Sequence, residues 1–137
     1  MKKGVIDLAN LDTVKGANEG FDVQIYHPAT NEDLGIVITV IGKDSDEFQK
    51  ITREQTKKRM QKATKGGFRN VTIPVEELEE DSLKLLAACT KSWKGVVENG
   101  KAIECTKENA MAIYEKYPWI REQVDTAIGD RANFIKT

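Results

Sequence analysis

The chain has 137 residues, a length typical of one domain, and its 21 basic and 22 acidic residues give a net charge of -1. This balance argues against a dedicated nucleic-acid-binding protein, which carries a strong basic excess. Hydrophobic residues make up 39% and charged residues 31%, a composition that excludes intrinsic disorder. No apolar run approaches the roughly 18–20 residues that cross a bilayer, and no signal-peptide core follows the first lysines. We expect a cytoplasmic protein without membrane contact.

The chain contains two cysteines, Cys89 and Cys105, and one histidine, His27, too few for a four-ligand zinc site without carboxylates. A reducing compartment favours two free thiols over a disulfide. His27 has no serine or cysteine near it in sequence, so only folding could bring a nucleophile to this base. The sequence also lacks a phosphate-binding loop and a dinucleotide fingerprint. We therefore expect no enzymatic activity, no catalytic residue, no metal and no cofactor.

The first segment, 1–20, is polar and interrupted by three glycines, which predicts an N-terminal arm ahead of a single domain at 21–137. The apolar residues that could anchor this arm on the domain are Val5, Ile6, Leu8 and Leu11. Without such anchoring, the arm would be ordered only by a partner.

The domain begins with a predicted β-hairpin over 21–42. Apolar and polar residues alternate in 21–26, a period of two that is typical of a strand with one buried face. Turn-forming residues dominate 27–33, and the β-branched run 34–41 suits a second strand.

A polar helix is predicted over 44–65. Asp44 is the expected N-cap, Glu47 occupies the reciprocal position of a capping box, and glycines follow at 66–67. This helix carries few apolar residues, so it packs weakly along most of its length. We expect it to project into solvent or to receive another surface, and 66–73 to form a linker.

A helical core is predicted over 74–137. Its first helix follows Pro74, has acidic residues in its first turns and shows the best amphipathic pattern of the chain. The residues on its apolar face are Val75, Leu78, Ser82, Leu85, Leu86, Cys89 and Trp93. We expect this helix to lie at the centre of the core.

Local signals define the rest of this core. Asn99 and Gly100 predict a tight turn, Thr106 caps a following helix, and Pro118 opens a last helix that runs to Ile135. The predicted fold class is therefore α+β, mostly α, with an N-terminal β-hairpin, a projecting polar helix and a C-terminal bundle of three helices.

Charge is unevenly distributed along the chain. Lys57, Lys58, Arg59 and Lys62 belong to a basic stretch, and an acidic block at 76–81 follows it closely. In one interpretation the two segments neutralise each other and are solvated. In the other, the basic helix docks on an acidic protein surface or on nucleic acid. The stretch includes one aromatic residue for base stacking, so nucleic acid is not the expected partner.

Trp119 is a second candidate for partner contact. Its neighbour Ile120 follows the inward stripe of the last helix, which leaves Trp119 free to point elsewhere, and tryptophan is enriched at binding hot spots. The predicted partner-binding residues are therefore Lys57, Lys58, Arg59, Lys62 and Trp119.

The C-terminal half contains a series of distinctive segments, namely Leu85–Thr90, Trp93–Val96, Thr106–Ala110, Tyr117–Ile120, Gln123–Val124 and Gly129–Phe134. Together with the hairpin from Phe21 to Ile41, this series resembles small proteins of the tail assembly chaperone type, encoded among the tail genes of long-tailed bacteriophages. The resemblance covers about residues 20–135.

The resemblance implies a non-enzymatic role in the host cell cytoplasm. Proteins of this type bind the phage tape-measure protein, keep its hydrophobic helices soluble and help to recruit tail-tube subunits. Self-association of the chain is a further partner interaction that the sequence leaves undecided. The first alternative is a virion structural protein, such as a connector, a tube-associated subunit or a head-decorating subunit. The second is a DNA-associated regulator that acts through the basic stretch.

Overall fold

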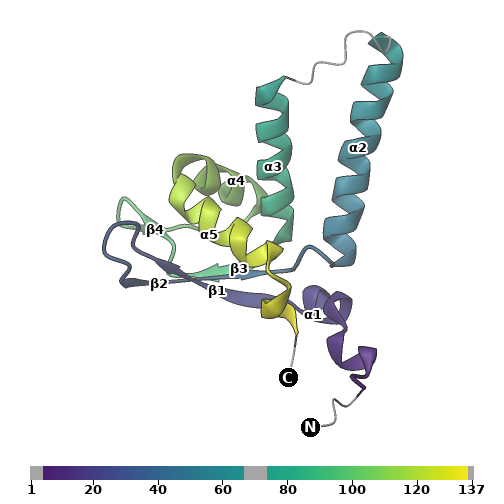
Figure 1. Ribbon diagram of the computed structural model, residues 1–137. Coiled ribbons are helices and arrows are strands. Elements are labelled where there is room, and N and C mark those ends of the chain that lie inside the picture. Colours follow the sequence, from purple (N-terminus) through teal and green to yellow (C-terminus); the bar gives the residue numbers. More distant parts are fainter. Residues whose placement is uncertain (1–4, 67–73, 136–137) are drawn as a thin grey trace.

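A three-stranded antiparallel sheet with helices on one face forms the body of the protein, and two helices project from it (Figure 1). The computed structural model describes residues 5–66 and 74–135. The predicted linker lies outside these residues, except for Gly66, the last residue of a helix. The fold is α+β and mostly helical, as the sequence predicts.

The sheet is built from β1 (Phe21–Tyr26), β2 (Asp33–Val40) and β3 (Thr90–Lys94), with β2 in the centre. The first two strands confirm the predicted hairpin. Val23 pairs with Ile38, and both side chains are buried under the helices. On the opposite face Thr39 donates from its hydroxyl to Asp22 at 2.7 Å. The alternation of apolar and polar residues thus sets which face is buried.

The third strand corrects the prediction for the core helix. The helix α3 (Val75–Cys89) ends four residues before Trp93, which lies on β3 opposite Ile38. The Trp93 indole donates to the carbonyl of Ile103 at 2.7 Å. Trp93 extends the apolar spacing of the predicted helix because its side chain also faces the core, although it does so from a strand.

The buried face of α3 also differs from the predicted one. Its buried residues are Leu83, Leu86, Ala87 and Cys89, all in the second half of the helix. Val75 and Leu78, which were expected in the core, are exposed. The first turns of α3 therefore extend beyond the body of the protein.

The projecting helix is α2 (Asp46–Gly66), which begins two residues later than predicted. Its N-cap is Ser45, whose buried hydroxyl accepts from the backbone N–H of Phe48 at 3.2 Å. Asp44 instead accepts two hydrogen bonds from the Arg131 guanidinium, at 2.7 and 3.1 Å. The predicted cap at Asp44 is therefore wrong, because a distant arginine engages this carboxylate.

The short-range signals of the C-terminal half are confirmed. Asn99 and Gly100 have positive φ angles of 52° and 77° between β4 (Val97–Glu98) and β5 (Lys101–Ala102). The Thr106 hydroxyl caps α4, accepting from the backbone N–H of Asn109 at 3.1 Å. Figure 1 places α4 (Lys107–Lys116) and α5 (Pro118–Gly129) beside α3 over the sheet.

The last predicted helix is shorter than expected. α5 ends at Gly129, and a separate 3-10 turn, η3 (Arg131–Phe134), follows it. Asp130 caps this turn by accepting from the backbone N–H of Ala132 at 3.0 Å. This cap redirects the chain so that Phe134 reaches the N-terminal segment.

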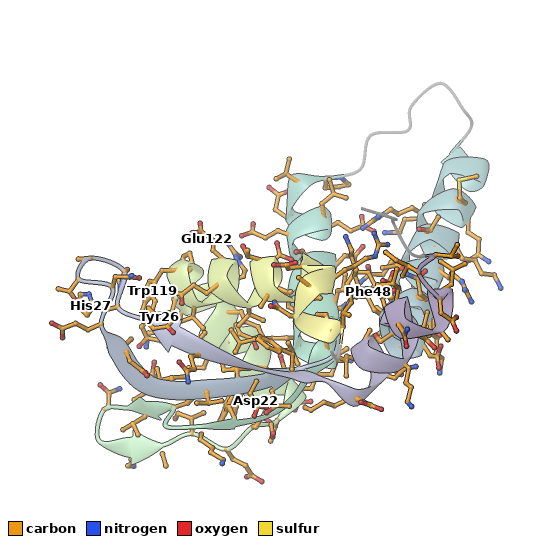
Figure 2. The ribbon with its side chains drawn as sticks, turned by 60° about the horizontal axis from the view of Figure 1, so that its bottom comes forward. Asp22, Tyr26, His27, Phe48, Trp119 and Glu122 are labelled. Atoms are coloured by element: carbon orange, nitrogen blue, oxygen red, sulfur yellow. The ribbon has the colours of Figure 1, made fainter. Side chains whose placement is uncertain are left out.

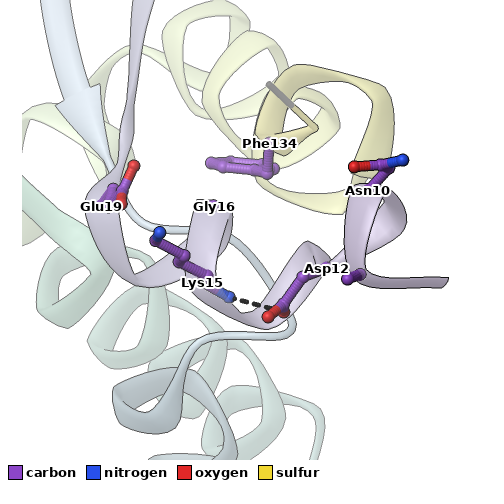
Figure 3. Close-up of a pocket in the computed structure, with 7 residues that line it drawn as sticks. Asn10, Asp12, Lys15, Gly16, Glu19 and Phe134 are labelled. Carbon is purple, nitrogen blue, oxygen red and sulfur yellow. Dashed lines mark hydrogen bonds between the residues drawn. The ribbon is translucent and has the colours of Figure 1, made fainter. Parts of the chain in front are cut away.

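The N-terminal segment packs through small residues instead of the predicted apolar anchors. It contains η1 (Leu8–Leu11) and α1 (Thr13–Glu19), in which Gly16 and Ala17 are buried. The proposed anchors Val5, Ile6, Leu8 and Leu11 are exposed. Phe134 instead packs over Gly16, as Figure 3 shows. Contact at this site needs a residue without a side chain.

Gly16→Ala tests this packing. A Cβ on residue 16 would lie 1.5 Å from the carbonyl oxygen of Phe134, so the backbone must move. We expect the free energy of unfolding to fall by about 1–3 kcal/mol in urea denaturation. Gly129→Ala is the matched control, because no atom lies within 4 Å of its Cβ position and alanine is the better helix former. Equal stability of the two variants would contradict the packing of α1 on η3.

Asp44→Asn tests the link between Asp44 and Arg131. The hydrogen bonds from Arg131 lower the Asp44 pKa from 3.8 to about 2. Because the folded-state pKa lies below the unfolded one, the stabilisation is complete above the unfolded value and is lost as the pH falls through about 2. At pH 7 we expect a loss of ~3 °C in melting temperature, since Arg131 is largely exposed to solvent.

Urea denaturation at neutral pH and near pH 3 checks the sign of this pH dependence of stability. The difference between wild type and Asp44→Asn should shrink at the lower pH. Asp125→Asn, which changes an exposed carboxylate on α5, should show no such dependence.

Candidate interaction surfaces

The pair formed by α2 and α3 projects from the body as an antiparallel helical hairpin (Figure 1). Polar contacts hold the two helices together. The Gln55 amide donates to the backbone carbonyl of Asp81 at 2.8 Å, and Arg59 pairs with the Asp81 carboxylate at 2.9 Å. Lys62 pairs with Glu77 at 2.7 Å. The basic stretch and the acidic block therefore neutralise each other at these positions.

Arg59 and Lys62, predicted to contact a partner, thus make intramolecular ion pairs. The Arg59 side chain is 29% exposed and that of Asp81 18% exposed, so this pair is partly shielded from water. Within the described part of the chain, Arg59 Nε is buried and has no hydrogen-bond partner. The pair is incompletely satisfied, which limits what it adds to stability. Lys57 and Lys58 are exposed on the same helix.

The outer halves of these helices expose apolar side chains. Met60 is 62% exposed, Val75 73% and Leu78 41%. Because Arg59 pairs with Asp81 and Lys62 with Glu77, Met60 and Leu78 lie at similar levels along the hairpin. We call Met60, Val75 and Leu78 the outer apolar residues. Their exposure suits contact with another protein more than chemistry on a small molecule.

Trp119, the other predicted contact residue, is half-buried and packs against the core. Its ring meets Tyr117 edge-on, with ring centres 6.3 Å apart. Figure 2 shows Trp119 toward the same end of the molecule as Tyr26 and His27. The core therefore covers part of the tryptophan surface.

One turn after Trp119, α5 contacts the edge of the sheet through Gln123. The Gln123 side-chain oxygen accepts from the backbone N–H of Tyr26, and its NH₂ group donates to the carbonyl of Tyr26, both at 2.9 Å. No sequence signal pointed to this contact, since the two residues are 97 positions apart.

An open groove of about 480 Å³ lies between β1 and α5, and the contact of Gln123 with Tyr26 is part of its lining. The strand contributes Val23, Gln24 and Tyr26, and the helix contributes Glu122, Gln123, Thr126 and Ala127. Asp130 and Asn133 also line it. We call this the β1–α5 groove.

A smaller depression of about 240 Å³ lies between α1 and Phe134 (Figure 3). Asp12 lines it, but its carboxylate caps α1 by accepting from the backbone N–H of Lys15 at 3.0 Å. Of the described residues that line it, none is a histidine, cysteine or serine.

The single histidine and the thiols occupy structural positions. His27 Nδ1 accepts from the backbone N–H groups of Ala29 and Thr30 at 3.0 and 3.1 Å, within the hairpin turn. Cys89 lies at the opposite end of β2, roughly 25 Å away at 3.3 Å per strand residue, since its carbonyl accepts from Ile41 N–H. Burial raises the Cys89 pKa to about 12 and also raises that of Cys105. Folding therefore does not bring His27 to Cys89, and protonated thiols are weak nucleophiles.

Two further observations concern cofactors and membranes. Among residues 5–66 and 74–135, no cluster of three or more histidine, cysteine, aspartate or glutamate side chains is placed to hold a metal ion. No helix within the same residues combines the length and apolar character needed to span a bilayer.

No protein-family model, no curated protein and no solved structure matches the chain.

Proposed function

We propose that the chain is a non-catalytic chaperone of bacteriophage tail assembly. In this role it binds the tape-measure protein in the host cytoplasm and helps tail-tube subunits to assemble. The observation that carries the proposal is the projecting α2–α3 hairpin, which exposes the outer apolar residues while the pairs Arg59–Asp81 and Lys62–Glu77 join its two helices.

The physics of the hairpin suits a helical client. An amphipathic helix binds where apolar side chains are exposed at the spacing of a helix surface, and Val75 and Leu78 are three positions apart on α3. With only a few apolar side chains, each contact is weak and reversible. Many copies along one long client would still bind firmly through multivalency.

Replacing Val75 and Leu78 together by aspartate tests this role. Both side chains are exposed, so the folded state should persist, whereas a charge in the apolar contact should weaken client binding at least tenfold. The measurement is co-purification of the tape-measure protein after co-expression, with circular dichroism as the check on folding. Val97→Asp, an exposed valine on β4, is the matched control and should retain the client. Retention by the double variant would contradict the proposed contact.

Mass spectrometry of purified phage particles separates a chaperone from a virion component. A chaperone that leaves before completion should be absent. Stoichiometric presence would instead favour a connector, a tube-associated subunit or a head-decorating subunit.

The basic residues allow a second test of the hairpin. Lys57→Ser with Lys58→Ser should leave the melting temperature within about 1 °C of wild type, because both side chains are exposed, and should weaken client binding. Arg59→Ser should lower the melting temperature instead, because it leaves Asp81 without its ion-pair partner. A duplex DNA probe should not bind either protein at low salt. Salt-sensitive DNA binding lost in the lysine variant would favour a DNA-associated regulator.

A further inference from the structure

The strand β1 is an edge of the sheet. Among the described residues it pairs with β2 on one side and with no strand on the other. Tyr26 directs its N–H and C=O away from β2, since both groups bond to Gln123. Backbone groups alternate in direction along a strand, so Asp22 and Gln24 present theirs to the same open side. Such an edge is a template for another strand.

Gln123 already occupies one position of this template. A side-chain carboxamide carries the same donor and acceptor as a peptide group, and Gln123 makes both bonds that an added strand would make to Tyr26. Gln123 is half-buried and is not one of the core residues of α5, so the amide can rotate away without opening the core. It therefore serves as a stand-in for one peptide unit of a fourth strand.

The chemistry of the β1–α5 groove indicates what that strand carries. Val23 and Ala127 give the groove an apolar floor, while Glu122 and Asp130 place negative charge on its helix side. None of the residues that line it is basic. A second copy of this chain pairing through β1 would bring these acids toward one another, which disfavours it. A strand with basic side chains complements them.

We propose that the β1–α5 groove binds an extended, basic segment of a partner protein as a fourth strand, with Gln123 as a displaceable placeholder. The added strand bonds to the backbone of Asp22 and Gln24 and, once Gln123 has moved, to Tyr26. Its alternate side chains enter the groove, where Glu122 and Asp130 attract lysine or arginine. This proposal does not depend on the tape-measure protein being the client of the α2–α3 hairpin.

The test uses the full chain and a short synthetic peptide in which valine and lysine alternate, followed by backbone amide NMR. We expect the amide signals of Asp22 and Gln24 to shift and their hydrogen exchange to slow. The same peptide with glutamate in place of lysine should bind at least tenfold more weakly. Unshifted β1 amides at saturating peptide, or equal binding of the two peptides, would overturn the proposal.

Two substitutions distinguish a placeholder from a residue with only a structural role. Gln123→Ala removes the competing hydrogen bonds, so affinity for the lysine peptide should rise roughly fivefold. A purely structural glutamine would give unchanged or lower affinity, and that result would refute its role as placeholder. Glu122→Lys should reduce the affinity several-fold, whereas Asp125→Lys, on the same helix but outside the groove, should not.

Sedimentation analysis without peptide tests whether a second copy of the chain occupies the edge of β1 instead. A monomer is the expected result. A dimer that Gln24→Pro dissociates would show that a second copy fills the edge, since proline removes the outward N–H at this position, and the basic-peptide proposal would then fail.

Discussion

The junction between α3 and β3 fixes the layout of the molecule. The Thr90 hydroxyl donates to the carbonyl of Leu86 at 2.8 Å, one of the carbonyls that a helix end leaves without an intrahelical partner. With that proton committed, the fully buried Tyr114 hydroxyl is the donor in its 2.6 Å bond to Thr90. Burial raises the Tyr114 pKa, so the phenol keeps this proton. The sheet, α3 and α4 therefore meet at Thr90, where the hydroxyls of Thr90 and Tyr114 and the carbonyl of Leu86 are hydrogen-bonded to one another.

The projection of the helical hairpin follows from that junction. α3 has 15 residues and spans about 22 Å, yet only its second half lies over the sheet. Because its end is held at Thr90, its beginning must extend past the body. α2 starts beside the sheet at Asp46 and accompanies α3 outward, so their contact depends on Arg59, Lys62 and their acidic partners. The exposed apolar residues are a consequence of where α3 ends.

Features set by neighbouring residues could be predicted from the sequence, and those set by distant pairing could not. The turn at Asn99 and the cap at Thr106 depend on a few adjacent positions, so the sequence identified them. The end of α3 depends on Trp93 pairing with Ile38, and apolar spacing cannot report that. The neutralised charges of the hairpin were one of two predicted arrangements. The contact of Gln123 with Tyr26 carried no signal, because an amide on a helix is ordinarily solvated.

The two edge strands of the sheet, β1 and β3, are protected in different ways, and this difference determines which of them can pair with another strand. β3 carries the exposed Lys91 and Lys94, whose charges oppose the approach of another strand. β1 is closed by Gln123, a neutral group that satisfies the backbone without repelling a newcomer. A charged edge stays closed to strands in general, whereas an edge capped by an amide exchanges one set of hydrogen bonds for an equivalent set at little net cost. Selectivity then passes to the flanking acids Glu122 and Asp130, which is why charge, more than shape, is expected to choose the partner.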